Sequence, residues 1–324
     1  MMQAPLITDA QTVEEAIARH TGSGAKVVSR TPVSGGCIAN GVRLETSAGT
    51  SYFLKQSATL PPEMFTAEAQ GLHALQSSRG PRVPVPVAVY PGDATAGAEE
   101  PRSAGRHASG TRRAHGAGAS EAFILMEWID TGRAGDGFHK RFGKQLALMH
   151  RELTADRFGF ARDNFIGSTP QPNSWRDSWG EFFADVRLRY QVRLAVDHGR
   201  VDGGTARQLE SVIQRADHLL VEPAAPAVLH GDLWGGNDLC DSGGDPVLID
   251  PAVYYGHPEA DLAMTELFGG FRPAFYRAYR AASPLAPGYD ERRDLYNLYH
   301  VLNHLNIFGG SYLEGVRRIA ARYA

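Results

Sequence analysis

The sequence predicts an α+β protein, β-rich to about residue 130 and mostly helical over residues 131–324. Between residues 27 and 90, short apolar runs alternate with glycine-containing turns, which is typical of strands. Farther along, apolar residues recur at helical spacing, as in segments 138–153 and 295–308. A chain of 324 residues can bury sizeable cores in about two domains.

The composition argues against several classes of protein. A formal charge of −3 offers nucleic acid no special attraction, and no apolar run approaches the ~20 residues that span a membrane. The N-terminus lacks the basic start and apolar core of a signal peptide. Cys37 and Cys240 are too few for a disulfide framework. We therefore expect a cytoplasmic protein.

The most informative stretch is the polar loop at residues 230–250, which lies between apolar segments. His230 and Asp232 are followed by Asn237, and Asp250 ends the next apolar segment. This H-x-D-x-x-x-x-N pattern with a trailing aspartate is typical of kinase-like phosphotransferases. Asp232 is the candidate acceptor of a hydroxyl proton, and Asn237 and Asp250 are oxygen ligands suited to Mg²⁺. The alternative is a surface loop of turn-capping residues, which the spacing and flanking strands disfavour.

The N-terminal part contains candidates for nucleotide binding. The turn at Gly35, Gly36 and Cys37 can bring backbone N–H groups close to phosphates, although such a turn is more often a plain hairpin. Lys55 ends a later strand, and Glu68 lies on the apolar face of a helix at about 63–77. An inward carboxylate needs a cation, so we expect Lys55 and Glu68 to pair and hold the phosphates of ATP. The alternative is a half-exposed glutamate.

Two further segments complete this part of the chain. Residues 91–121 are rich in Ala, Gly, Ser and Arg without apolar periodicity, which predicts a flexible insert. The next strand ends at Met126 and is followed by Glu127, Trp128 and Ile129. In a kinase-like fold this segment joins two lobes, with ATP between them, and binds adenine through backbone groups.

The wording HGDLWGGN, DPAVYYGHPEADLA and FGGF resembles the fructosamine kinase (ketosamine kinase) family, as do the upstream GGCIAN, YFLK and FGFARDNFIGSTPQPNSWRDSWGEFF. The resemblance implies a protein-kinase-like bilobal fold, with a nucleotide-binding N-lobe at 1–130 and a catalytic, substrate-binding C-lobe at 131–324. It also implies ATP-dependent, Mg²⁺-dependent phosphorylation of ketoamines or glycated proteins at O-3′, a deglycation activity, with ribulosamines and erythrulosamines favoured. Asp261 is implied to support the catalytic loop.

Candidates for substrate contact are Trp234, His257 and Glu259. The residues Gln171, Asn173, Trp175 and Trp179 either pack the C-lobe or line the sugar site, and packing is expected for the tryptophans. We expect His150 to be a hydrogen-bonded core histidine. A shared metal at His300 and His304 is disfavoured because no third ligand is evident.

Some alternatives stay open. An aminoglycoside or choline kinase shares the catalytic pattern but lacks the DPAVYYGHPEADLA wording, and a pseudokinase is disfavoured by the intact chemical positions. We expect a monomer. Cys37, beside the phosphate-binding turn, is predicted to be a reactive thiol that can link two chains when oxidised.

Overall fold

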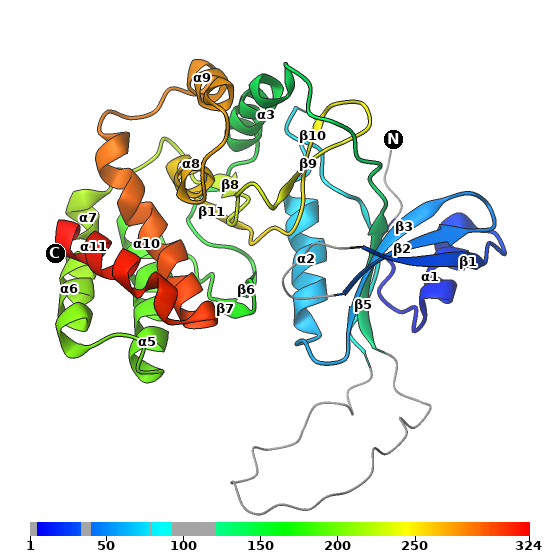
Figure 1. The fold of residues 1–324 in the computed structure, drawn as a ribbon, viewed down its shortest axis with the longest axis horizontal. Helices are drawn as coiled ribbons and strands as arrows, with labels where there is room; N and C mark the ends of the chain where they lie inside the picture. The colour runs from blue at the N-terminus through cyan, green and yellow to red at the C-terminus, as the bar shows by residue number, and fades with distance from the viewer. Residues whose placement is uncertain (1–4, 34–39, 78, 93–120) are drawn as a thin grey trace, which may run out of the picture. The chain divides into compact units, whose positions relative to one another are not determined.

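The structure is a computed structural model that describes residues 5–33, 40–77, 79–92 and 121–324 (Figure 1). Gly35, Gly36 and Cys37 lie outside the described residues, and so does the predicted insert except at its two ends. The chain forms two compact units. The first comprises Met1–Ala69 and Val85–Trp128, and the second comprises Gln70–Pro84 and Ile129–Ala324.

The first unit is built on an antiparallel sheet with the strand order β1-β2-β3-β5-β4. Its strands are β1 Val27–Val33, β2 Asn40–Thr46, β3 Ser51–Ser57, β4 Pro86–Tyr90 and β5 Ala122–Glu127. Side chains alternate along β3, so Tyr52 and Leu54 are buried on one face. The same alternation directs Lys55 to the opposite face.

Two helices accompany these strands, and the second is the helix expected at about 63–77. Helix α1, Val13–Thr21, begins at Thr12, whose hydroxyl accepts the N–H of Glu15 at 3.2 Å. The apolar side of α1 packs into the sheet core with Leu44 and Leu54. Helix α2, Glu63–Ala74, buries Phe65 and Leu72, as its apolar spacing predicts.

The second unit is mostly helical, in agreement with the α+β prediction. Its helical elements are α3 Phe138–Glu152, α4 Trp179–Glu181, η1 Phe182–Leu188, α5 Arg189–Asp197, α6 Gly203–Gln214, α7 Ala216–Leu219, α8 Pro258–Leu267, α9 Pro273–Ala282, α10 Tyr289–Phe308, η2 Gly310–Tyr312 and α11 Leu313–Tyr323. Its strands form short antiparallel pairs: β6 Asn164–Ile166 with β7 Thr169–Gln171, β8 Ala227–Leu229 with β11 Tyr254–Gly256, and β9 Asp238–Cys240 with β10 Pro246–Leu248.

The helical stretch at residues 179–197 contains a π-helical segment, η1, between α4 and α5. All of the η1 side chains except that of Asp185 are buried. An α-helix on the surface would expose more of these side chains to solvent. The pattern of polar and apolar residues does not predict a π-helical segment that is buried on nearly all sides. Trp179, which precedes η1, is fully buried against Phe183 and Tyr296, so the expectation that it packs the core is confirmed.

A membrane-spanning helix is not found among the residues that the structure describes, since none of their helices combines enough length with enough apolar character.

Candidate active site

The strand pair β8 and β11 carries the first part of the polar motif, residues 230–232. Strand β8 is fully buried, and its last residue, Leu229, pairs with Tyr254 of β11. The N–H of Ala252 donates to the carbonyl of His230 at 2.8 Å. Residues 230–232 therefore emerge from a buried strand beside the segment that precedes β11.

The strand pair β9 and β10 carries the second part of the motif. Asn237 immediately precedes β9, and Asp250 follows β10 after one intervening residue, Ile249. The N–H of Ile249 donates to the carbonyl of Asn237 at 3.1 Å. Strand pairing therefore places Asn237 beside the segment that bears Asp250.

Asp261, in the first turn of α8, holds the backbone of the catalytic loop. Its carboxylate accepts the N–H groups of His230 at 2.7 Å and Gly231 at 2.9 Å. Nε2 of His150 lies 3.2 Å from the same carboxylate, and its Nδ1 lies 2.8 Å from the hydroxyl of Tyr279. Burial raises the pKa of Asp261, but the hydrogen bonds from His150 and the backbone outweigh it and lower that pKa. The expected roles of Asp261 as loop support and His150 as core histidine are confirmed.

His230 ties the catalytic loop to the segment before Asp250. Its Nε2 lies 2.8 Å from the carbonyl oxygen of Ile249, which can only accept, so Nε2 carries the proton. Nδ1 is then free to accept the N–H of Asp232 at 3.3 Å. Burial lowers the pKa of His230, which favours this neutral form. His230 belongs to the sequence motif, but the motif alone does not reveal this bridging role.

Gly231 allows the loop that begins at His230 to approach the backbone of Ala252 closely. Its φ of 81° lies in the left-handed region that favours glycine. A Cβ atom at this position would lie 2.0 Å from the carbonyl oxygen of Ala252. Any larger residue would therefore meet both backbone strain and a clash.

Asp232 and Asn237 form one hydrogen-bonded unit. The side-chain Nδ2 of Asn237 donates to the backbone carbonyl of Asp232 at 2.8 Å and to its Oδ2 at 3.2 Å. Burial raises the pKa of Asp232 to about 7, with the hydrogen bond from Asn237 opposing the shift and the charge of Asp250 adding to it. A carboxyl group whose pKa lies near neutrality is suited to accepting a proton.

Asp250 adopts an uncommon backbone conformation. Among the non-glycine residues that the structure describes, it alone has a positive φ, 53°. Aspartate tolerates this region better than most residues, and such strain concentrates at functional sites. The conformation sets Asp250 near enough to Asp232 for its charge to raise the pKa of that residue.

The donor set suits a magnesium ion better than a transition metal. Nδ2 of Asn237 is directed to Asp232, which leaves its Oδ1 available to a metal ion, and the carboxylate of Asp250 is the second predicted ligand. Within the described ranges, no group of three His, Cys, Asp or Glu side chains is placed to hold a metal ion. Mg²⁺ commonly takes only one or two protein ligands, together with waters and substrate phosphates.

A buried polar network holds the backbone of Ala252 and Val253, the residues between Pro251 and β11. Gln171 donates to the carbonyl of Ala252 at 3.0 Å, and Asn164 donates to that of Val253 at 2.7 Å. The hydroxyl of Tyr299 donates to Oε1 of Gln171 at 2.6 Å. Gln171 therefore packs inside the second unit, which decides between the two roles left open for it.

Arg187 of η1 extends this network. Its guanidinium donates to the side chain of Asn173 at 2.6 Å and lies 4.0 Å from the ring centroid of Tyr254. Asn173 in turn donates to Asn164 at 2.9 Å, and like Gln171 it is buried. Asn173 is thus also a packing residue. The sequence does not predict that an arginine lies at the centre of this network.

The first unit contains the predicted ion pair. Nζ of Lys55 lies 2.7 Å from Oε1 of Glu68, and the two side chains are 14% and 16% exposed. Lys55 leaves the face of β3 opposite Leu54, and Glu68 lies on α2 among buried apolar residues. The pairing is therefore confirmed as a contact, while the role of the pair in nucleotide binding stays a prediction.

Comparison with known proteins shows to which family the chain belongs. The model of the fructosamine kinase family matches residues 9–323, nearly the whole chain. The chain belongs to the fructosamine kinase family. A probable ketoamine kinase of Synechocystis is 40% identical over 95% of this chain and 95% of its own. The protein-ribulosamine 3-kinase of Arabidopsis thaliana chloroplasts is 38% identical over 93% of this chain and 84% of its own.

Solved structures agree with this membership of the fructosamine kinase family. A candidate fructosamine-3-kinase from Thermobifida fusca has a TM-score of 0.77 and 33% identity over 97% of this chain and 99% of its own. An aminoglycoside phosphotransferase has a TM-score of 0.54 at 15% identity over 95% and 98% of the two chains. The second likeness concerns the fold alone, and it confirms the predicted kinase-like class.

The predicted adenine-binding segment runs across the boundary between the units along the chain. Met126 and Glu127 end β5, Trp128 closes the first unit, and Ile129 opens the second. The backbone N–H of Glu127 donates to the carbonyl of Val85 at 2.9 Å. That N–H is therefore committed to the sheet edge, and the adenine contact of the other groups stays a prediction.

The structure gives two of the three substrate candidates other roles. Glu259 is 1% exposed, and both of its carboxylate oxygens accept hydrogen bonds from Arg292, at 2.7 and 2.9 Å. His257 is buried and caps α8, with its Nδ1 accepting the N–H of Glu259 at 3.1 Å. Both side chains are therefore engaged in structural contacts within the second unit. Trp234 is half-buried on the catalytic loop and stays a candidate.

Proposed function

We propose that this protein is an ATP-dependent ketosamine 3-kinase. It transfers the γ-phosphoryl group of ATP to the O-3′ hydroxyl of a sugar that is joined to an amine as a ketoamine. The hydrogen-bonded pair of Asp232 and Asn237 beside Asp250 carries the proposal, on a chain that the family model matches from residue 9 to 323. The names of the ketoamine and ribulosamine kinase relatives support the substrate class.

In this proposal Asp232 accepts the proton of the attacking hydroxyl. The hydroxyl oxygen forms a bond to the γ-phosphorus, the bond from that phosphorus to the bridging oxygen breaks, and ADP departs with the electron pair. Asn237 orients the Asp232 carboxylate through its Nδ2, His230 accepts the N–H of Asp232, and Asp261 holds the backbone just before it. Mg²⁺, when bound at Asn237 and Asp250, neutralises phosphate charge.

Groups of the first unit are proposed to hold the nucleotide. Lys55, positioned by Glu68, offsets the charge of the α- and β-phosphates, which the 2.7 Å ion pair supports. The turn at residues 35–37 is proposed to contact phosphates. Segment 126–129 is proposed to contact adenine.

The proposed substrates are ribulosamines and erythrulosamines in preference to fructosamines. Phosphorylation at O-3′ makes the adduct unstable, so that the free amine is regenerated and the activity serves deglycation. We propose a cytoplasmic monomer in which Cys37 can link two chains when it is oxidised. A low cysteine content supports that compartment.

The test is ATP consumption against a panel of ribulose-lysine, erythrulose-lysine, fructose-lysine and an aminoglycoside. We expect turnover of the ketoamines, fastest for the two shorter sugars, and none of the aminoglycoside. Turnover confined to the aminoglycoside would contradict the proposal. Nucleotide binding without turnover of any acceptor would instead indicate a pseudokinase. The Asp232→Asn variant, assayed in parallel, controls for contaminating kinases.

A further inference from the structure

A row of aromatic side chains leads away from the catalytic loop of the second unit. Trp234, two residues after the proposed proton acceptor, lies edge-on to Phe268 with ring centroids 6.1 Å apart. Phe268 packs on His304 at 5.0 Å. His304 in turn packs on Phe308 at 5.5 Å and Tyr312 at 5.0 Å. We refer to these five side chains as the aromatic row.

Two members of the aromatic row leave much of their apolar surface in solvent. Phe268 is 44% exposed and Phe308 is 56% exposed. Scattered exposed apolar residues are ordinary, but these two rings belong to a series of ring contacts that begins at Trp234, beside Asp232, which favours a binding role. The reacting hydroxyl must reach Asp232, so a ligand bound there can extend along the aromatic row.

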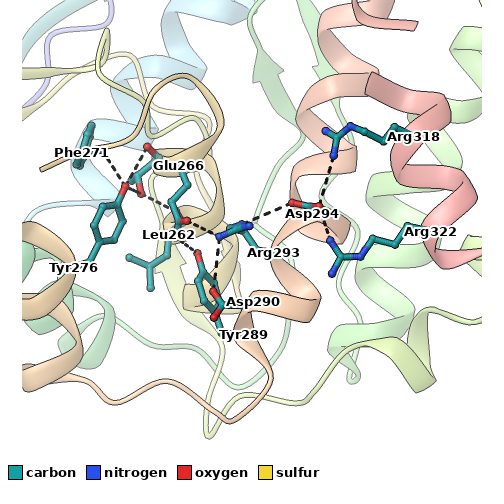
Figure 2. Close-up of polar contacts among 11 residues, drawn as sticks. Leu262, Glu266, Phe271, Tyr276, Tyr289, Asp290, Arg293, Asp294, Arg318 and Arg322 are labelled. Atoms are coloured by element: carbon teal, nitrogen blue, oxygen red, sulfur yellow. Dashed lines mark hydrogen bonds and ion pairs between the residues drawn. The ribbon is translucent and has the colours of Figure 1, made fainter. Parts of the chain in front are cut away.

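The turn that bears Phe268 is stabilised by two glycines and by hydrogen bonds of the Tyr276 hydroxyl. Gly269 and Gly270 have φ values of 96° and 73°, which allow the chain to reverse immediately after α8. At the far side of the turn, the N–H of Phe271 donates to the hydroxyl of Tyr276 at 2.9 Å (Figure 2). That hydroxyl lies 3.3 Å from the carbonyl oxygen of Thr265 near the end of α8.

A second set of hydrogen bonds joins α8 to α10, the helix that carries His304 and Phe308. Glu266 accepts hydrogen bonds from the hydroxyl of Tyr289 at 2.8 Å and from Arg293 at 2.9 Å (Figure 2). Tyr289 and Arg293 lie in the first turns of α10. The helix that Phe268 follows is therefore tied to the helix that carries His304 and Phe308.

The chemistry of a ketoamine matches the aromatic row. In a ketoamine, two carbon–carbon bonds separate carbon 3, with its reacting hydroxyl, from carbon 1, which bears the nitrogen. That nitrogen is a secondary amine, protonated at neutral pH, and it continues into the carbon chain of the original amine. A cation is attracted to the faces of aromatic rings, and methylene groups are stabilised by burial against them.

His304 is compatible with a neighbouring cation. Its Nδ1 lies 2.8 Å from the carbonyl oxygen of His300, so Nδ1 carries the proton and donates. Burial lowers the pKa of His304, which favours the neutral ring. A neutral ring does not repel an ammonium group.

We propose that the aromatic row receives the amine half of the ketoamine, with the ammonium group near Trp234 and Phe268 and the carbon chain along Phe308 and Tyr312. This inference rests on the proposed function and extends it from the sugar to the amine. It makes the aromatic row the part of the second unit that selects among amines. Adducts of long-chain amines such as lysine are then preferred to adducts of short ones.

The test compares three substrates that share ribulose. They are the adducts of n-butylamine and methylamine, and the neutral ether in which oxygen replaces the nitrogen of the butylamine adduct. For the unaltered protein we expect kcat/KM to be highest for the butylamine adduct. Phe268→Ala and Phe308→Ala should each lower it about 5–10-fold for that adduct, and by clearly less for the methylamine adduct.

Matched variants separate the two kinds of contact. Phe308→Leu keeps apolar area but removes the ring, so it should retain more of the preference for butylamine over methylamine than Phe308→Ala does. Val196→Ala on α5 truncates another apolar side chain of similar exposure, 46%, which is not a member of the aromatic row, and should leave the preference unchanged. Retention of the preference in both Phe268→Ala and Phe308→Ala, with ketoamine turnover intact, would overturn the inference alone. Absence of ketoamine turnover by the unaltered protein would overturn the proposed function as well.

Discussion

The side-chain amide of Asn237 donates to both the backbone carbonyl and the carboxylate of Asp232, at 2.8 and 3.2 Å. The proposed proton acceptor is therefore oriented by the same residue that is proposed to bind the metal ion. This double contact leaves only one useful orientation for the Asn237 side chain, with Oδ1 directed away from Asp232. Position and charge, rather than covalent chemistry, are what such a site contributes to phosphoryl transfer.

Replacing the proton acceptor gives the first prediction. Asp232→Asn keeps the shape of the side chain but removes its capacity to accept a proton. We expect kcat to fall about 10²–10⁴-fold, with nucleotide affinity largely retained. Steady-state kinetics and calorimetric titration with ATP provide the measurements. A kcat within about tenfold of the unaltered protein would show that Asp232 is not a general base.

Asp250→Asn is the matched comparison for that experiment. Asparagine also tolerates the positive φ of 53° at this position, so the fold should be preserved. Loss of the carboxylate should weaken the binding of Mg²⁺–ATP in addition to slowing turnover. Unaltered affinity for Mg²⁺–ATP would remove Asp250 from the proposed metal ligands.

The close approach of Gly231 to Ala252 gives a second prediction. Gly231→Ala should destabilise the catalytic loop, because the methyl group would overlap the Ala252 carbonyl and the residue would be strained at a φ of 81°. We expect the free energy of unfolding to fall by about 2 kcal/mol or more, and kcat to fall with it. Gly49→Ala is the control, because it has a similar φ of 78° with nothing within 4 Å of the new atom. Equal effects of the two substitutions on stability would contradict the steric explanation.

Much of the catalytic site can be predicted from the sequence because its determinants are local. The spacing of residues 230–237, the alternation that turns Lys55 away from Leu54, and the helical phase of Glu68 all follow from one strand, one helix or one loop. These are the features that the structure bears out as contacts. Periodicity needs no knowledge of distant partners.

The parts that could not be predicted depend on partners far apart in the chain. Glu259 has the composition of a substrate ligand, but Arg292, thirty-three positions later, occupies both of its oxygens. Arg187 has the charge of a surface residue, yet η1 turns it into the interior, where Asn173 and aromatic rings surround it. A one-dimensional pattern records burial poorly when the buried group is polar.

The support behind the catalytic segment gives a third prediction. Tyr299→Phe removes the donor to Oε1 of Gln171 and leaves that buried acceptor unsatisfied. We expect the free energy of unfolding to fall by about 1–3 kcal/mol in urea denaturation. Tyr255→Phe is a suitable control, because the residues that the structure describes provide no hydrogen bond to the Tyr255 hydroxyl. Equal stability of the two variants would show that the Tyr299 contact contributes nothing.

The buried histidines give a fourth prediction, on acid stability. Burial, together with the charge of Arg292, lowers the pKa of His257 from 6.5 to about 3. Between these two values the unfolded chain binds a proton that the folded chain does not, so stability falls as the pH drops below about 6.5. His300, whose pKa burial also lowers to about 3, adds to the same trend.

His257→Asn tests this trend without removing the helix cap. Asparagine is a good N-cap residue and does not titrate. The slope of unfolding free energy against pH between 4.5 and 6 should become shallower by about 1.4 kcal/mol per pH unit, the value for one proton. A slope identical to that of the unaltered protein would show that His257 is already protonated in the folded state.

The most direct measurement is the position of the phosphate in the product. Ribulose-lysine is incubated with Mg²⁺–ATP and the enzyme, and the product is examined by phosphorus-coupled NMR. The proposed function predicts a phosphate on O-3′ of the sugar, followed by release of free lysine, and neither event with Asp232→Asn. A phosphate on another hydroxyl, or no phosphorylated ketoamine at all, would contradict it.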